Sequence, residues 1–247
     1  MAECKQKLQN LRWINNPILY SGESAEQVFA LDHQLAQRAA NGEGPFLHVW
    51  RAKDVLVLGS RDVSSQFDVV QEHFRQKGYR LIVRQSGGAL VPLDAGVVNL
   101  SYICAKSPGQ LHADEDFHFL ADWLRDSTGT ERVMIGEVDG SYCPGRFDLQ
   151  MDGRKVCGIA QRRYSGAVVV QAFINVEVDG NRRATLAKQF YELSAQSAHS
   201  QTPLFQIQLD KVGSLQQFSG IHTPEQFVER LRMTAKQRFR TIVMEEQ

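Results

Sequence analysis

The chain has 247 residues, of which 43% are hydrophobic and 23% are charged. A chain of this length can bury about 70–75% of the surface that it exposes when unfolded, and the composition is that of a globular protein. The 28 lysine and arginine residues balance 28 aspartate and glutamate residues. This balance excludes a general electrostatic attraction to nucleic acid or to an anionic membrane.

The N-terminal residues 1–16 lack the continuous apolar stretch of a secretory signal, and no window approaches the ~18 apolar residues of a membrane span. We therefore expect a cytoplasmic protein. The four cysteines, Cys4, Cys104, Cys143 and Cys157, form no Cys-x-x-Cys pair and are too sparse for a disulfide scaffold. We expect reduced thiols, no bound metal and no cofactor.

In the first half of the chain, apolar residues at helical spacing predict a helix over 24–40, which the sequence NGEGP ends. The apolar segments 46–50 and 55–59 flank a polar turn, which predicts a β-hairpin. A helix is expected around 65–76. Further strands are expected at 79–85, 89–93 and 97–104, and Pro92 favours the edge of a sheet.

In the second half, a helix is predicted over 114–128, with acidic residues in its first turn as the helix dipole prefers. Asp152 and Gly153 separate two alternating runs and predict a hairpin of strands 147–151 and 155–161. The run 167–178 is expected to be the longest strand. Helices are expected near 182–194 and over 224–240. With no repeat or linker, one α+β domain over 1–247 is the simplest organisation.

Cys143 has the local surroundings of an accessible thiol. Pro144 follows it and disfavours helical backbone at Cys143, which we expect in an extended or loop conformation. Lys155 lies across the predicted turn, and an ammonium within a few ångströms of the sulfur favours the thiolate form. The alternative is a small buried cysteine and a solvated strand lysine, and the spacing alone leaves both open.

Cys157 is a second candidate partner for the lysine. Strand alternation places Lys155, Cys157 and Ile159 on one face and Val156 with Gly158 on the other. A cysteine inside a strand usually has a packing role, so we rank Cys157 below Cys143 as a nucleophile.

Three stretches together carry a resemblance to a known family. "RQSGGALVPLDAGVVNLS", "SYCPGRFDL" and "GRKVCGIAQRR" resemble the lipoate and biotin protein ligase superfamily, above all its cysteine-dependent octanoyltransferases that take the acyl group from the glycine cleavage H protein. The resemblance covers about residues 25–195. It implies a ligase-like α+β catalytic domain with a mixed, mostly antiparallel sheet and outer helices.

The resemblance also implies roles for individual residues. Cys143 carries the acyl group as a thioester, while Lys155 favours the thiolate and positions the acyl carbonyl. Cys157 falls at a position of small residues, where core packing explains it. The residues that border the acyl pocket are Arg84, Ser86, Gly87, Gly88, Gly158 and Ala160.

The same resemblance implies the partners: octanoylated glycine cleavage H protein as donor, and lipoyl domains of 2-oxoacid dehydrogenase complexes as acceptors. Octanoyl acyl carrier protein is an alternative donor. An ATP-dependent lipoate ligase is a second alternative, but Ala89 and Leu93 replace a glycine and a histidine of those ligases. A non-catalytic binding or scaffold protein is a third. The sequence leaves the choice between octanoyl and lipoyl groups open.

Several other residues have a chemical and a structural interpretation. Leu90, Val98 and Leu100 are candidate walls of the acyl pocket or plain core residues. Asp148 either orients Lys155 or is an exposed strand carboxylate. A cluster of Arg154, Lys155, Arg162 and Arg163 either meets an acidic carrier protein or is a solvated face. We expect structural or surface roles for His48, His112 and His118.

Overall fold

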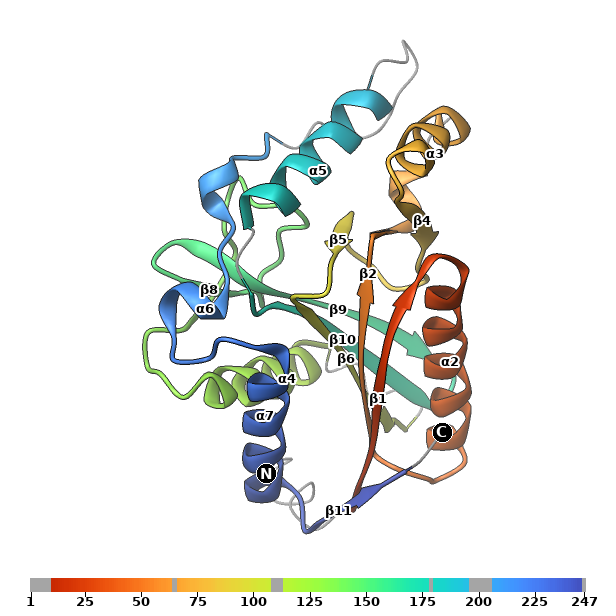
Figure 1. Ribbon diagram of the computed structural model, residues 1–247. Coiled ribbons are helices and arrows are strands. Elements are labelled where there is room, and N and C mark those ends of the chain that lie inside the picture. The colour runs from red at the N-terminus through yellow and green to blue at the C-terminus, as the bar shows by residue number, and fades with distance from the viewer. Residues whose placement is uncertain (1–9, 64–65, 108–112, 178–179, 196–205, 246–247) are drawn as a thin grey trace.

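The computed structural model describes residues 10–63, 66–107, 113–177, 180–195 and 206–245 (Figure 1). Within these residues the strands form a large sheet and a small one, with helices outside, which confirms the predicted α+β class. The large sheet contains β1 (Asn10–Ser21), β2 (Phe46–Lys53), β6 (Val97–Ala105), β7 (Met134–Ile135), β8 (Leu149–Met151), β9 (Arg154–Tyr164), β10 (Ala167–Asn175) and β11 (Thr241–Met244). The small sheet contains β3 (Val55–Leu58), β4 (Arg80–Val83) and β5 (Val91–Leu93).

The centre of the large sheet is antiparallel. Its strand order is β11-β1-β2-β6-β10-β9-β8-β7, and β2, β6, β10 and β9 each run antiparallel to the next. β1 runs parallel to both β2 and β11. In the small sheet β3 is central, parallel to β4 and antiparallel to β5. The prediction of a mixed, mostly antiparallel sheet is confirmed, and Pro92 lies in an edge strand as predicted.

Helices cover both faces of the large sheet (Figure 1). The helices are η1 (Gly22–Ala25), α2 (Glu26–Ala40), η2 (Ser60–Asp62), α3 (Phe67–Gln76), α4 (Ala113–Thr128), α5 (Gly180–Ser194), η3 (Leu209–Lys211), α6 (Leu215–Phe218) and α7 (Pro224–Arg238). α2 packs on one face, α4 and α7 pack on the other, and α3 and α5 lie beside the small sheet. No described helix combines the length and the apolar character that crossing a bilayer requires.

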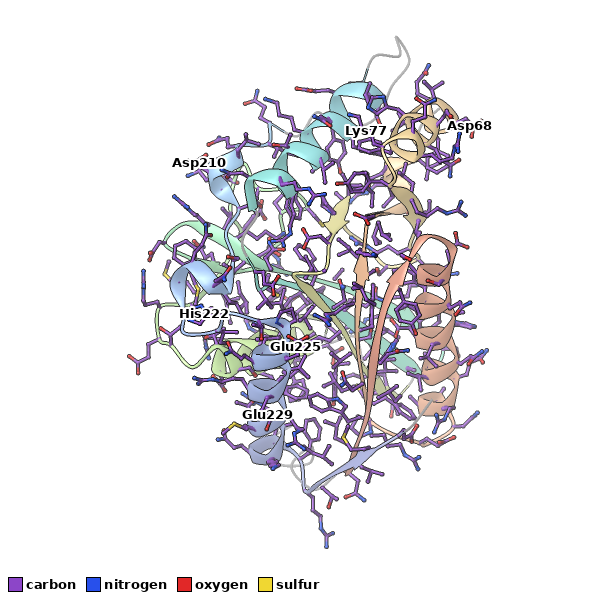
Figure 2. All side chains as sticks on the ribbon, in the orientation of Figure 1. Asp68, Lys77, Asp210, His222, Glu225 and Glu229 are labelled. Atoms are coloured by element: carbon purple, nitrogen blue, oxygen red, sulfur yellow. The ribbon has the colours of Figure 1, made fainter. Side chains whose placement is uncertain are left out.

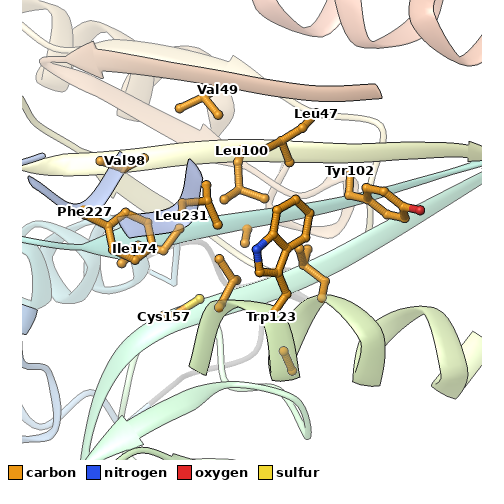
Figure 3. Close-up of a cluster of buried hydrophobic side chains, with 14 of the residues drawn as sticks. Leu47, Val49, Val98, Leu100, Tyr102, Trp123, Cys157, Ile174, Phe227 and Leu231 are labelled. Atoms are coloured by element: carbon orange, nitrogen blue, oxygen red, sulfur yellow. The ribbon is translucent and has the colours of Figure 1, made fainter. Parts of the chain in front are cut away.

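Two buried cores position the elements around the site. The core under α4 and α7 contains Trp123, Phe227 and Leu231 packed on one face of the strands (Figure 3). A second core joins the small sheet and α5 to the opposite face of the large sheet. On α7 the charged side chains Glu225 and Glu229 are exposed (Figure 2).

The predicted hairpin of segments 46–50 and 55–59 is wrong. β2 and β3 belong to different sheets, and only Asp54, with φ of 58°, separates them. One residue cannot form the two-residue turn that a tight hairpin needs, so the chain bends from one sheet into the other. The longest strand is β1, with 12 residues, and not the segment 167–178, whose last residue lies outside the described residues.

The remaining predicted elements agree with the structure. The helices predicted over 24–40, 114–128 and 182–194 match helices of nearly the same bounds. The helix predicted over 224–240 ends two residues earlier, and the start of the one near 65–76 lies outside the described residues. The hairpin of β8 and β9 is present, and Asp152 and Gly153 take the positive φ values of 51° and 72° that its turn requires.

Truncating Phe227 tests whether α7 folds together with the sheet. The ring is fully buried in the core under α4 and α7, so Phe227→Ala should lower the free energy of unfolding by about 3–5 kcal/mol. Met233 lies on the same helix with 56% of its surface exposed, and Met233→Ala should change it by less than about 0.5 kcal/mol. Urea unfolding followed by tryptophan fluorescence measures both. Two separate transitions in the wild-type chain would contradict a single cooperative domain.

Candidate active site

Cys143 lies in a tight turn between Gly140 and β8. Its φ is 47°, a left-handed conformation that residues other than glycine rarely adopt. The residue is therefore in a loop, as expected before Pro144, but in the left-handed region instead of the extended one. The side chain is half-buried, so a reagent or substrate can still reach the thiol.

Donors from the loop between β4 and β5 face the Cys143 sulfur. The backbone N–H of Ala89 donates to the sulfur at 3.1 Å, and the Arg84 guanidinium lies 3.7 Å from it. Arg84 also donates to the carbonyl oxygens of Gly87 and Ala89, at 3.1 and 3.0 Å. A negatively charged acceptor gains more from such donors than a neutral one does, so the surroundings suit a thiolate.

Gly88 allows this loop to approach the sulfur. Its φ is 94°, and a Cβ atom built on it would lie 3.0 Å from the Cys143 sulfur and 2.6 Å from Arg84 Nη2. A side chain here would push the loop away from Cys143. Of the glycine pair that the sequence singled out, Gly88 is thus required by a close approach of two segments, whereas a Cβ atom on Gly87 would meet no atom of the described residues within 4 Å.

Lys155 is fully buried beneath the Cys143 turn. Its Nζ donates to the carbonyl oxygen of Tyr142 at 3.2 Å and to that of Cys143, and it pairs with the Asp148 carboxylate at 2.7 Å. The three donors of the ammonium group are therefore directed at oxygen atoms of the turn. The Lys155 ammonium group thus binds the backbone carbonyl of Cys143. The groups that face the Cys143 sulfur are the Ala89 N–H and the Arg84 guanidinium.

Asp148 binds both Lys155 and the backbone of the turn. One carboxylate oxygen accepts both the Lys155 ammonium and the backbone N–H of Gly145, the latter at 2.9 Å. Asp148 is buried, so it orients Lys155 and is not an exposed strand carboxylate. Burial raises the pKa of Asp148 to about 6, although the neighbouring Lys155 ammonium opposes this shift.

The predicted faces of β9 are wrong because the strand is irregular. Leu149 pairs with Cys157 and the next residue, Gln150, pairs with Lys155, so Val156 is an extra residue in β9. Lys155 then lies on the side of Gly158, where a Cβ atom would come within 3.0 Å of Lys155 Cε.

Cys157 lies on the opposite face from Lys155. It is buried among the residues under α4 and α7 (Figure 3). Burial raises the pKa of the Cys157 thiol well above its usual range. Core packing therefore explains Cys157, and the alternative in which it partners Lys155 is wrong.

An apolar pocket opens next to Cys143. It encloses about 460 Å³ of atom-free space, including its open mouth. The described residues that line it are Phe29, Trp50, Val57, Arg84, Ser86, Leu93, Asn99, Leu100, Ser101, Cys143, Gly158, Ile159, Ala160, Gln171, Ala172 and Phe173. Gly158 is needed there because a Cβ atom on it would lie 2.3 Å from the ring of Phe173.

The floor of the pocket follows the register of the large sheet. Two rows of directly paired residues cross β2, β6, β10 and β9: Trp50, Asn99, Phe173 and Gly158 in the first, and His48, Ser101, Gln171 and Ala160 in the second. Successive residues of a strand point to opposite faces. Val98 and Leu100 therefore contribute their side chains to the core under α4 and α7, although Leu100 also touches the pocket, and Leu90 packs in the second core.

The structure brings most of the predicted site residues together. Arg84, Ser86, Gly158 and Ala160 line the pocket with Cys143. Gly87 and Gly88 lie beside it through their contacts with Arg84 and Cys143, and Lys155 lies beneath the turn. Sequence reasoning missed the Ala89 N–H, a backbone group that no residue type reveals. It also missed Asn99 and Gln171, which the alternation of β6 and β10 could have indicated.

The predicted basic cluster is not present as one patch. Lys155 is buried, Arg163 pairs with Asp116 at 3.0 Å, and Arg154 stacks on Phe218. Of the histidines, His48 is buried with Nδ1 2.8 Å from Asp32, His118 contacts the ring of Phe147, and His112 lies outside the described residues. His48 thus has the structural role predicted for it.

The sequence of this chain matches a known family. A model of the lipoyl protein ligase A/B catalytic domain matches residues 24–236, and the chain belongs to this family. It is 36% identical over 196 residues to an octanoyl-[GcvH]:protein N-octanoyltransferase of Anoxybacillus flavithermus, covering 78% of this chain and 71% of that protein. An enzyme of the same name from Geobacillus kaustophilus is 38% identical over 177 residues, covering 70% and 62%.

The fold comparison agrees with the family. A lipoate-protein ligase A solved with ATP superposes with a TM-score of 0.73, covering 97% of this chain and 89% of that one, at 17% identity. At this identity the likeness supports the fold alone. The ligase-like fold expected from the sequence is thus confirmed.

The buried Asp148 carboxyl should make stability depend on pH. Burial raises its pKa to about 6 in the folded chain, whereas an exposed aspartate has a pKa of about 3.9, so folding takes up a proton between these values. The stability that this group contributes is fully present below about pH 4 and is lost as the pH rises through about 6. Between these limits the wild-type chain should lose up to about 1.4 kcal/mol per pH unit relative to Asp148→Asn. Urea unfolding across this range measures the difference, and parallel profiles would contradict it.

Proposed function

We propose that this chain transfers an octanoyl group from octanoylated glycine cleavage H protein to lysines of the lipoyl domains of 2-oxoacid dehydrogenase complexes, through a thioester on Cys143. The observation that carries the proposal is the Cys143 sulfur, which accepts the Ala89 N–H at the edge of an apolar pocket. The names of the relatives support octanoyl transfer from this donor. The reaction belongs in the cytoplasm, the location that the sequence favours.

The reaction exchanges one amide for another in two steps. In the first, the Cys143 sulfur attacks the carbonyl carbon of octanoyl-lysine, the carbon–nitrogen bond breaks, and the thiol proton leaves with the lysine amine. In the second, the amine of the acceptor lysine attacks the thioester, and its proton returns to the sulfur. One amide is broken and one is formed, so the exchange requires no ATP. The donor and acceptor proteins can therefore bind in turn.

Each step passes through a tetrahedral intermediate with a negatively charged oxygen. The Ala89 N–H and the Arg84 guanidinium lie closest to the sulfur, and we assign the stabilisation of this charge to them. The Gly145 N–H is already used by Asp148, and the donors of Lys155 are used by the turn. The role of Lys155 is therefore to hold the backbone of Cys143, including its carbonyl group, in place.

The pocket supplies the environment for an eight-carbon chain. Its apolar walls include Phe29, Val57 and Phe173, and walls of this kind suit an alkyl chain. Ser86 Oγ, Trp50 Nε1 and Asn99 Nδ2 are buried at the pocket without a hydrogen-bond partner among the described residues. These groups are available to the polar atoms of the acyl-lysine amide.

The alternatives differ in their donor and in their need for ATP. Octanoyl acyl carrier protein would use the same thiol, and only the relatives' names favour the H protein over it. An ATP-dependent ligase would form an acyl-adenylate and need no cysteine, and Ala89 and Leu93 count against it. Leu93 lines the apolar pocket, where the ligases carry a histidine according to the family pattern.

Intact-protein mass spectrometry tests the thioester. Incubation with octanoylated H protein in the absence of ATP should add about 126 Da to the chain, and hydroxylamine should remove this mass. Cys143→Ser should lose the hydroxylamine-sensitive adduct. Cys157→Ser, which changes a buried thiol of the opposite core, should keep it. Absence of the adduct in the wild-type chain would contradict the proposal.

The same assay decides the donor. We expect the adduct from octanoylated H protein to form at least about tenfold faster than from octanoyl acyl carrier protein, a preference of about 1.4 kcal/mol. A faster reaction with acyl carrier protein would identify that alternative. Acceptor modification that requires ATP and persists in Cys143→Ser would identify the ligase. Binding of either carrier without any adduct would identify a binding protein.

A further inference from the structure

Two buried side chains hold the loop between β4 and β5, the loop whose donors face the Cys143 sulfur. Asp62 ends the short helix η2 and is 3% exposed, and Tyr191 lies on α5 and is 1% exposed. Neither residue lines the pocket, and the chemistry described above uses neither. Both nevertheless connect directly to the segment that donates to the sulfur.

The connection is a chain of hydrogen bonds with ordinary distances. The backbone N–H of Leu90 donates to the Tyr191 hydroxyl at 3.0 Å, and this hydroxyl donates to Asp62 Oδ1 at 3.0 Å. The other oxygen, Asp62 Oδ2, accepts the backbone N–H of Gly59 at 2.8 Å. Asp62 and Tyr191 thus link α5 and the end of β3 to the loop.

These bonds fix the orientation of the Ala89–Leu90 peptide. The Ala89 N–H points at the Cys143 sulfur, the Ala89 carbonyl accepts from Arg84, and the Leu90 N–H is held by Tyr191. The Ala89 carbonyl and the Leu90 N–H belong to one planar peptide unit, which is joined at the Ala89 Cα atom to the unit that carries the Ala89 N–H. Loss of the bond to Tyr191 would free this unit to turn, break its bond to Arg84, and loosen the backbone that positions the Ala89 N–H.

We propose that Asp62 and Tyr191 are positioning residues that hold the Ala89 N–H on the Cys143 sulfur and thereby support its thiolate form. The inference rests on the proposed role of Cys143 as the nucleophile. It implies that α5, through Tyr191, influences the reactivity of a thiol that Tyr191 does not touch.

A purely structural role explains these two residues less well. Burial raises the pKa of Asp62, so keeping this carboxyl group charged costs free energy. An apolar residue would fill the same space without that cost. The Tyr191 ring packs against Phe190 in the second core, and a phenylalanine would pack equally there. What the hydroxyl adds to the ring is the link between Asp62 and Leu90.

Tyr191→Phe isolates the hydroxyl because it keeps the ring. The rate constant for alkylation of Cys143 by iodoacetamide at pH 7 should fall about fivefold, as the loss of one hydrogen bond of this kind predicts. At pH 9.5, where ordinary thiols are ionised, the rate should return to that of the wild-type chain. Mass spectrometry of the Cys143 peptide measures the rate. Tyr102→Phe, which removes an equally buried hydroxyl from the opposite core, should leave it unchanged.

Asp62→Asn provides a second measurement if Tyr191→Phe folds poorly. The amide can accept from Tyr191 through its oxygen but cannot accept from Gly59 through its nitrogen, so a smaller reduction at pH 7 is expected. Unchanged rates at pH 7 in both variants would overturn the inference. A reduction that persists at pH 9.5 would also overturn it, because it would reflect access to the thiol and not its ionisation.

This test is independent of the acyl substrate. Alkylation needs no octanoylated protein, so failure of the octanoyl adduct to form would contradict the proposed function without deciding the positioning role. If the adduct forms, acylation by the donor should slow by the same factor in Tyr191→Phe, with the KM for the donor unchanged. An increase in KM alone would assign Tyr191 to donor binding and overturn the inference.

Discussion

The site depends on the interactions that stabilise the buried ammonium group of Lys155. Moving a charge out of water costs several kcal/mol, and the fold offsets this cost only where acceptors surround the charge. Here the acceptors are the Asp148 carboxylate and the carbonyl oxygens of Tyr142 and Cys143. The backbone of the turn therefore directs its carbonyl oxygens at the ammonium group. These contacts hold Cys143 in a left-handed conformation, which costs about 1–3 kcal/mol for a residue with a side chain.

The irregularity in β9 makes this arrangement possible. In a regular strand Lys155 would share a face with Cys157 and project into the apolar core under α4 and α7, away from the carbonyl oxygens of the Cys143 turn. The extra residue, Val156, turns the lysine to the face that carries the pocket. The same irregularity leaves Cys157 in the core. One added residue thus brings Lys155 to the Cys143 turn while Cys157, two positions further on, stays in the core.

Local sequence predicted the elements and the reacting residues better than their relative placement. The Cys-Pro-Gly stretch, the lysine twelve residues later and the Asp152–Gly153 turn depend on neighbours in the chain, and the structure brings these residues together. The faces of β9 and the separation of β2 from β3 depend on strand register and on distant partners. A short window of sequence encodes neither, so those two predictions failed. The Ala89 N–H was invisible because every residue except proline has one.

Cys143 and the donors to its sulfur lie in loops of different sheets. Cys143 precedes β8 of the large sheet, whereas Ala89 and Arg84 belong to the loop between two strands of the small sheet. Their alignment therefore depends on the second core, in which Tyr142 and Phe173 pack with residues of the small sheet and α5. Packed cores resist small displacements, because interlocking side chains leave few voids. The 3.1 Å contact between the Ala89 N–H and the Cys143 sulfur is thus held by the core behind it, and the surroundings of the sulfur depend on that packing as much as on the residues next to it.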